Sequence, residues 1–196
     1  MVSPAACTSA LWFAWLAGWI LAARSTATTV VRQPLADRLT HSVLMWGGAA
    51  LLFFVPSRRS GILEHSILPA RPWLAWIGVV LVVVGLGFSV WARVHLGRLW
   101  SGAVTLKTDH TLIRTGPYRW TRHPIYTGLL LALLGTTLVR GTLGALAGFL
   151  LLVLGVLLKI RQEEVLLMEH FGDEYRIYRR DVPKVIPRLR NHFSAD

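Results

Sequence analysis

The chain contains little cysteine and few acidic residues. Cys7 is the one cysteine among 196 residues, so no disulfide can form within the chain. The seven histidines are scattered, and no Cys/His cluster has zinc-site spacing, which predicts that the protein binds no metal. Ten acidic residues stand against 21 cationic ones, giving a formal net charge of +11. Such a charge suits either nucleic acid or an anionic membrane surface.

The apolar residues decide between these two partners. They make up 54% of the chain, the mean hydropathy is +0.50, and they are concentrated in long runs. Runs of this kind are typical of a membrane protein, and nine tryptophans suit the interfaces of a bilayer. We therefore expect membrane lipid as a partner and no nucleic acid.

Five apolar segments predict the fold. Each is expected to be a helix, because irregular backbone is not tolerated against lipid. The second segment is short for a membrane span, and the last two meet at Arg140 and Gly141, which predicts a tight helical hairpin. We predict an all-α, multi-pass integral membrane protein with about five transmembrane helices, at about 9–31, 41–56, 72–92, 124–139 and 141–160.

The distribution of Lys and Arg predicts the orientation. With the N-terminus outside, 17 of the 21 cationic residues fall on the cytoplasmic side, which places the C-terminus and the active site there. We divide the chain into an N-terminal transmembrane scaffold of about three helices, 1–92, and a polar region, 93–196. The remaining four cationic residues are Arg58, Arg59, Arg71 and Arg140.

Polar residues are densest in GPYRWTRHPIYTG, residues 116–128, directly before an apolar run. The Gly-Pro pair predicts a turn, and Pro124 suits the first turn of a helix, so His123 should lie at the helix boundary. Free backbone donors at that boundary can bind an anion such as a carboxylate. The alternative is an interfacial basic belt formed by Arg119, Arg122 and His123.

The segment after the fifth apolar run concentrates the scarce carboxylates. Five of the ten acidic residues lie between Glu163 and Glu174. Glu163 is four residues after Lys159, and Glu164 is three after Arg161, so each pair can meet on a helix surface. This pattern indicates either a solvated, salt-bridged helix end or a site for a cationic ligand at the membrane exit.

An amphipathic helix is predicted at the C-terminal end of the chain. Phe171, Tyr175, Tyr178 and Val182 recur at steps of four, three and four residues and form one apolar face. Such a helix can lie on the lipid interface, or it can cap a pocket.

These motifs together resemble the isoprenylcysteine carboxyl methyltransferase family and, more loosely, the phospholipid methyltransferases. The resemblance covers roughly residues 93–187 and rests on four pieces: H-T-L-I, G-P-Y, R-H-P-x-Y-x-G and E-E-x-L-L-x-x-x-F-G-x-E-Y-x-x-Y. It implies an integral membrane enzyme that uses S-adenosylmethionine. Its cofactor pocket would be built from the loop before R-H-P, that motif, and the helix that carries the carboxylates.

The resemblance also implies site residues. Arg161 and Glu164 are the candidate catalytic residues, with Arg161 as the cation on the substrate side. Which of the two adjacent glutamates binds the cofactor is left open. The predicted cofactor contacts are His110, Leu112, Ile113, Tyr118, Arg122, His123, Tyr126, Glu163 and Glu164.

The chemistry of the cofactor agrees with this set. Arg122 and His123 suit its carboxylate, a glutamate suits its ammonium, and apolar side chains suit its adenine. Methyl transfer is an in-line displacement that needs positioning and exclusion of water more than an acid–base pair. A carboxylate acceptor would need no base, whereas a thiol or an amine would need one, and Glu163, Glu164 or His110 could serve.

We therefore predict methyl transfer to a lipophilic small-molecule or prenylated acceptor: an isoprenylcysteine carboxylate or another lipid-soluble carboxylate, thiol or amine. The alternative is an NADPH-dependent membrane reductase of the sterol or steroid type, which carries a similar G-x-Y-x-x-x-R-H-P-x-Y segment. The E-E and F-G-x-E-Y motifs favour the methyltransferase. A membrane scaffold without enzymatic activity explains the charge but not the Gly/Pro/His/Tyr pattern.

Overall fold

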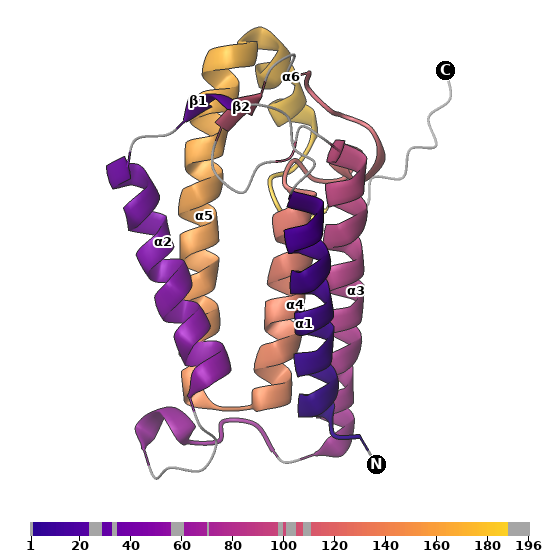
Figure 1. Cartoon of the computed structure of the whole chain (residues 1–196), viewed down its shortest axis with the longest axis vertical. Helices are drawn as coiled ribbons and strands as arrows, with labels where there is room; N and C mark the ends of the chain where they lie inside the picture. Colours follow the sequence, from indigo (N-terminus) through magenta and orange to yellow (C-terminus); the bar gives the residue numbers. More distant parts are fainter. Residues whose placement is uncertain are drawn as a thin grey trace.

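The computed structural model describes residues 2–23, 29–32, 35–55, 61–69, 71–97, 100, 105–107 and 111–187. Helices dominate this part of the chain, as the apolar runs predict. A small antiparallel sheet of β1 (Thr29–Arg32) and β2 (Thr105–Lys107) was not predicted (Figure 1). The α-helices are α1 (Pro4–Ala22), α2 (Leu35–Ala49), α3 (Pro72–Leu96), α4 (Pro124–Arg140), α5 (Leu143–Phe171) and α6 (Asp173–Asp181).

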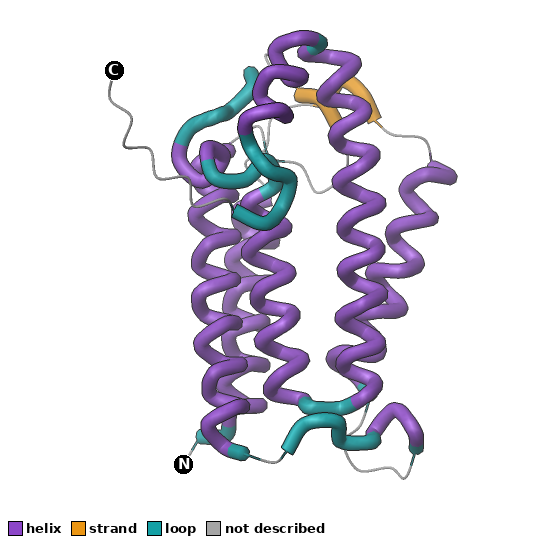
Figure 2. Tube along the Cα trace, turned by 180° about the vertical axis from the view of Figure 1, so that it is seen from behind, coloured by secondary structure: helices purple, strands orange, loops and turns teal. Residues whose placement is uncertain are grey.

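The five longer helices lie side by side and alternate in direction. α1, α3 and α5 end, and α2 and α4 begin, at the end of the bundle where α6 and the small sheet lie (Figures 1 and 2). α1, α3 and α5 are long and apolar enough to cross a membrane. α4 and the apolar stretch of α2 with its π-helical extension, Ala50–Phe54, are shorter.

Helix boundaries depart from the predicted ones at several places. The prediction of a helix to about residue 31 was wrong, because α1 ends at Ala22 and the β-branched segment Thr29–Arg32 forms β1. α2 begins at Leu35 and not near residue 41. α1 starts at Pro4 and not near residue 9, because the Ser3 hydroxyl accepts a hydrogen bond from the Ala6 amide (3.2 Å) and caps the helix. α5 runs beyond its apolar part to Phe171, so its last three turns carry the polar residues of the site.

Glycines allow close approach within two antiparallel helix pairs. A Cβ on Gly128 of α4 would lie 2.4 Å from the carbonyl oxygen of Gly85 on α3, and one on Gly148 of α5 would lie 2.6 Å from that of Gly48 on α2. Small residues serve membrane helices in this way, because dispersion contacts replace the hydrophobic effect there. α3 and α4 therefore form one tight pair, and α2 and α5 form another.

The two pairs are joined at the end opposite α6. Gly141, at φ 63°, ends α4, and Thr142 caps α5 by accepting from the Ala145 amide (3.3 Å). Next to this turn, Leu52, Leu133, Ala145 and Leu152 form a buried apolar cluster that spans both pairs.

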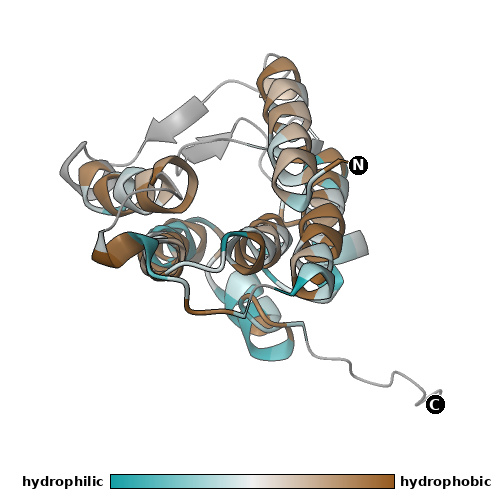
Figure 3. Ribbon diagram, turned by 90° about the horizontal axis from the view of Figure 1, so that it is seen from below, coloured by the Kyte–Doolittle hydropathy of each residue, from teal (hydrophilic) through white to brown (hydrophobic). Residues whose placement is uncertain are grey.

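The outward faces of the bundle are apolar, as lipid-facing surfaces should be. Phe13 is 72% exposed and Trp46 is 78% exposed. In the view along the bundle, the long helices carry strongly hydrophobic residues on their outer sides, while α6 is mainly hydrophilic (Figure 3). Large apolar side chains left uncovered over a whole surface indicate contact with lipid.

Candidate functional site

The R-H-P motif enters α4 as the sequence predicts. Gly116, at φ 57°, begins a 3₁₀ turn over Gly116–Arg119 that buries Tyr118. His123 is the N-cap of α4 and Pro124 its first residue, where a missing amide proton costs no hydrogen bond. Arg122 and His123 thus lie where the polar segment meets the bundle.

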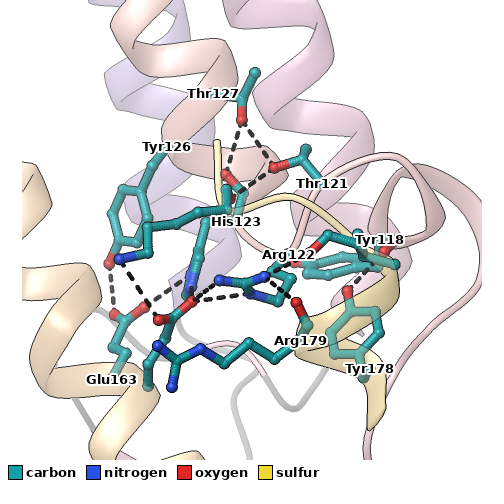
Figure 4. A network of polar contacts seen from close by, with 12 residues as sticks. Tyr118, Thr121, Arg122, His123, Tyr126, Thr127, Glu163, Tyr178 and Arg179 are labelled. Atoms are coloured by element: carbon teal, nitrogen blue, oxygen red, sulfur yellow. Dashed lines mark hydrogen bonds and ion pairs between the residues drawn. The ribbon is translucent and has the colours of Figure 1, made fainter. Parts of the chain in front are cut away.

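A buried ion pair joins this motif to α5. Arg122 donates from Nε (2.9 Å) and Nη2 (2.7 Å) to Oε1 of Glu164, and both side chains are buried. Figure 4 shows Arg122 within this network, between His123 and Arg179. Two charge-assisted hydrogen bonds to one carboxylate fix both partners. Because an adjacent cation favours the ionised carboxyl, Glu164 is held as a carboxylate.

His123 lies between the two adjacent glutamates. Its Nε2 is 3.3 Å from Oε1 of Glu164, and its Nδ1 is 3.5 Å from Oε2 of Glu163. Burial lowers the pKa of His123, but the hydrogen bonds to Glu163 and Glu164 outweigh burial and raise the pKa above its usual value. A protonated imidazole, with two N–H groups, suits this position because each nitrogen faces a carboxylate.

Glu163 differs from Glu164 in its exposure. The Tyr126 hydroxyl donates to Oε1 of Glu163 at 2.5 Å, and the side chain of Glu163 keeps 21% of its surface exposed, against 7% for Glu164. The Lys159 ammonium lies 5.6 Å from the centroid of the Tyr126 ring. Of the two carboxylates, Glu163 is therefore the one with surface available to a ligand.

A C-terminal strap, residues 182–185, binds the two backbone amides that directly precede α4. The sequence predicted free backbone donors at this boundary, and the amides of Arg122 and His123 already have acceptors. The bonds run from Arg122 N to Pro183 O (2.9 Å), from His123 N to Lys184 O (3.1 Å) and from Thr127 Oγ1 to Val185 O (2.6 Å).

The side chain of Arg122 also holds the end of α6. Its Nη1 donates to the carbonyl oxygens of Arg179 (2.9 Å) and Val182. Cations at a helix C-terminus interact favourably with the carbonyl dipoles there. One side chain therefore binds α5 through Glu164 and α6 through its last carbonyls.

α6 packs its predicted apolar face against the site. Tyr175 and Tyr178 are buried, and the Tyr178 hydroxyl donates to the carbonyl oxygen of Tyr118 at 2.6 Å. The predicted period was right, and these two tyrosines of the apolar face contact protein rather than lipid. The polar outer face carries exposed ion pairs such as Arg176 with Asp173.

The remaining predicted residues lie around this network. Leu112 and Ile113 are half-buried just before the Gly116 turn. Burial, and then the charge of Glu163, raise the pKa of Tyr118, so its phenol stays neutral. Arg161 is exposed on α5 and forms no ion pair within the described part of the chain. His110 lies outside the described residues.

Several residues of the network were not predicted. Thr121 is fully buried and donates to the Lys184 carbonyl at 2.7 Å, and the Lys184 ammonium is 3.6 Å from Oε2 of Glu164. Threonine next to R-H-P offered a weak signal, but the strap offered none, because it binds mainly through its carbonyls. Over the described residues, no group of three or more His, Cys, Asp or Glu side chains has the geometry of a metal site.

A sequence profile of the family described as the isoprenylcysteine carboxyl methyltransferase (ICMT) family matches residues 76–169. Protein-S-isoprenylcysteine O-methyltransferase of Schizosaccharomyces pombe is 36% identical over 101 residues, which are 50% of this chain and 43% of that protein. The enzyme of the same name from Homo sapiens is 31% identical over 121 residues, which are 60% of this chain and 43% of the human protein. The chain thus spans less than half the length of these two relatives.

A solved structure gives an independent comparison. The eukaryotic intramembrane Ras methyltransferase ICMT matches with a TM-score of 0.53 at 24% identity, covering 80% of this chain and 54% of that one. At this identity the match supports the fold alone. Together with the three long apolar helices, it identifies this chain as an integral membrane protein.

Proposed function

Because residues 76–169 match the isoprenylcysteine carboxyl methyltransferase family, we propose that this protein transfers a methyl group from S-adenosylmethionine to a lipophilic acceptor. The observation that carries the proposal is the network of polar contacts between the R-H-P-x-Y motif and the two adjacent glutamates of the E-E motif. It runs from Arg122 to Glu164 and from Tyr126 to Glu163. The relatives described above are methyltransferases by name, and none of them supports the reductase alternative.

The groups of the site fit the cofactor, and the contacts of each group suggest which part of the cofactor it would bind. Glu163 suits the ammonium because it keeps exposed surface beside the Tyr126 hydroxyl. Half-buried Leu112 and Ile113 with Tyr118 suit the adenine. When bound, S-adenosylmethionine would supply the activated methyl group. His110, His123 and Tyr126 stay predicted contacts.

Arg122 and Glu164 take a different role in the proposal. The donors of Arg122 are directed to Glu164 and to the end of α6, and the side chains of Arg122 and Glu164 are both buried. We assign these two residues to holding α4, α5 and α6 together around the cofactor, and Glu163 to contact with it. This chooses between the two glutamates that the sequence left open.

The charges of the site favour an acceptor that arrives as an anion. Hydrogen bonds to Glu163 and Glu164 outweigh burial and raise the pKa of His123, which favours the imidazolium over the neutral imidazole that a general base needs. Glu164 is paired with Arg122. An amine or a thiol would need to lose a proton, whereas a carboxylate is ionised already. We therefore place a lipid-soluble carboxylate, such as that of an isoprenylcysteine, ahead of the other acceptors.

The substrate-side cation is proposed on α5. Arg161 was predicted for this role and is exposed on that helix. Lys159, two residues earlier, lies over the Tyr126 ring and nearer to the network.

The membrane arrangement proposed for this function has five spans, with α2 and α4 as the two shorter ones and α4–α5 as a hairpin. The network then lies on the cytoplasmic side, where 17 of the 21 cationic residues fall, and α6 caps it at the interface. A polar cofactor would enter from the cytoplasm and a lipophilic acceptor from the bilayer. The division into a scaffold, 1–92, and a methyltransferase-like region, 93–196, stays a prediction, and the family match begins earlier, at residue 76.

Calorimetric titration of the detergent-purified protein tests the proposal. We expect saturable binding of S-adenosylmethionine and no binding of NADPH titrated in parallel. Binding of NADPH alone would restore the reductase alternative. Absence of binding for both, in detergent and in lipid nanodiscs, would overturn the cofactor assignment.

A further inference from the structure

Arg93 is a buried arginine in the last turn of α3. It is 6% exposed and donates from Nη1 to the carbonyl oxygen of Gly97 (2.8 Å) and from Nη2 to that of Ala22 (2.9 Å). Its Nε is buried without a partner, and no carboxylate pairs with Arg93 among the residues that the structure describes. Ala22 ends α1 and Gly97 caps α3, so the carbonyl dipoles of two helix C-termini balance its charge.

The same guanidinium contacts Trp100, four residues after the end of α3. Its central carbon lies 4.3 Å from the ring centroid of Trp100, and Trp100 meets Trp19 of α1 edge-on, with ring centroids 5.4 Å apart. A flat guanidinium over an indole is among the stronger cation–π arrangements. Arg93 therefore fixes the point at which the chain leaves α3 toward the site.

The far end of that loop returns to the same helical turn. His95 Nε2 lies 2.9 Å from the Thr115 hydroxyl, and its ring faces that of Tyr118 at 6.3 Å. A Cβ on Gly116 would lie 2.6 Å from the His95 ring, so only glycine allows this approach. The last turn of α3 thus contacts Trp100 near one end, and Thr115 at the other end, of residues 98–115, which we call the cofactor loop and of which the structure describes 100, 105–107 and 111–115.

Two tryptophans of α1 fix its position along α3 and α4. Trp15 Nε1 donates to the Ser89 hydroxyl of α3 at 3.0 Å, and Trp12 Nε1 donates to the Thr136 hydroxyl of α4 at 2.9 Å. Hydrogen bonds of this kind are specific in a bilayer, where few other polar partners exist. They hold the end of α1 where its Ala22 carbonyl reaches Arg93.

We propose that Arg93 is a positioning residue of the cofactor site, which couples the end of α1 to the start of the cofactor loop. α1 lies outside the family-matched segment, and through Arg93 and Trp100 it supports a loop whose end carries Leu112, Ile113 and Tyr118. This inference rests on the proposed function, because it needs a cofactor whose affinity reports on the loop.

The test compares Arg93→Met and Trp100→Leu, singly and combined, with wild type by calorimetric titration of S-adenosylmethionine and by melting temperature in detergent. Arg140→Met is the matched control, because Arg140 also donates to a carbonyl, that of Val55, at the opposite end of the bundle. A misplaced support typically weakens binding severely, so each site variant should raise the Kd about 10-fold or more. The double variant should raise the Kd by less than the product of the two single effects, because both changes remove the contact between Arg93 and Trp100.

Each outcome decides the inference. Arg140→Met should lower the melting temperature while leaving the Kd within about twofold, since that region does not meet the cofactor loop. If wild type binds the cofactor and the Arg93 and Trp100 variants bind equally well, the inference is overturned while the proposed function stands. If wild type does not bind it, the proposed function fails first. Should Arg93→Met not fold, Arg93→Lys decides in its place, because lysine keeps the charge but lacks the two separate Nη donors that reach the carbonyls of Gly97 and Ala22.

Discussion

Arg122 and Glu164 form a buried ion pair in which Nε and Nη2 of the arginine both donate to one carboxylate oxygen, at 2.9 and 2.7 Å. The pair joins the start of α4 to the polar end of α5, and the same guanidinium holds the last carbonyls of α6. Residues 42 positions apart in sequence thus set the arrangement of three helices.

Breaking this pair should destabilise the fold strongly. Arg122→Met leaves a buried carboxylate without its main partner, a change that typically costs about 3–5 kcal/mol. We expect a large fall in the melting temperature in detergent. Arg176→Met is the matched control, because Arg176 pairs with Asp173 on the exposed face of α6, and its loss should be barely measurable. Equal melting temperatures for the two variants would show that the buried pair does not hold the helices.

Substitutions of the two adjacent glutamates should affect different measurements, the cofactor Kd for Glu163 and the melting temperature for Glu164. Glu163→Gln removes the carboxylate proposed to face the cofactor ammonium, so the cofactor Kd should rise about 10-fold, with a smaller fall in melting temperature than Glu164→Gln causes. Glu164→Gln removes the charge opposite Arg122, so its main effect should be a fall in the melting temperature. Calorimetry and thermal melting on both variants measure this, and the reverse pattern would exchange the two roles.

His123 should make stability depend on pH. Its hydrogen bonds to Glu163 and Glu164 raise the pKa in the folded state, while the unfolded chain keeps the ordinary value near 6.5. A raised pKa contributes stability that is fully present below the unfolded pKa and is lost as the pH rises through the folded pKa. The difference in melting temperature between wild type and His123→Gln should therefore shrink as the pH rises from 6 toward the folded pKa. A difference that grows with pH would mean that the imidazole is neutral in the fold.

Much of the fold was predictable from residue patterns, because the forces that set it are local. The apolar runs gave the helices, and the position of Pro124 gave the start of α4. The start of α1 was missed because a single hydroxyl, that of Ser3, caps the helix upstream of the apolar run.

The site was predictable to the extent that it depends on side-chain type. The sequence indicated Tyr118, His123, Tyr126 and the two glutamates, and the structure brings these together. It did not indicate the strap, because carbonyl acceptors such as those of Pro183 and Lys184 exist in every sequence. Nor did it indicate the pairing of Arg122, because a cation beside a helix start is equally compatible with a bound anion and with a distant carboxylate.

Close packing of α3 on α4 should not tolerate a methyl group. Gly128→Ala would place its Cβ 2.4 Å from the Gly85 carbonyl and 2.7 Å from the Ser89 amide, so the helices must separate. Overpacking of this kind typically costs about 1–3 kcal/mol. Gly87→Ala is the control on α3, because nothing lies within 4 Å of its Cβ position. Thermal melting should show a loss for the first variant only, and tolerance of both would mean that the helix pair adjusts freely.

The acceptor side should depend on a cation of α5, and two candidates can be compared on one helix. Arg161 is exposed, whereas Lys159 lies over the Tyr126 ring, and Tyr126 donates to Glu163. If the acceptor is a carboxylate, removing the cation that meets it should raise the acceptor KM about 10-fold or more while leaving the cofactor Kd unchanged. We expect this split for Lys159→Met and a much smaller effect for Arg161→Met, measured with a prenylated cysteine carboxylate and labelled S-adenosylmethionine. A large effect confined to Arg161→Met would restore the residue predicted from sequence, and no effect in either variant would exclude a cation of α5 from binding the acceptor.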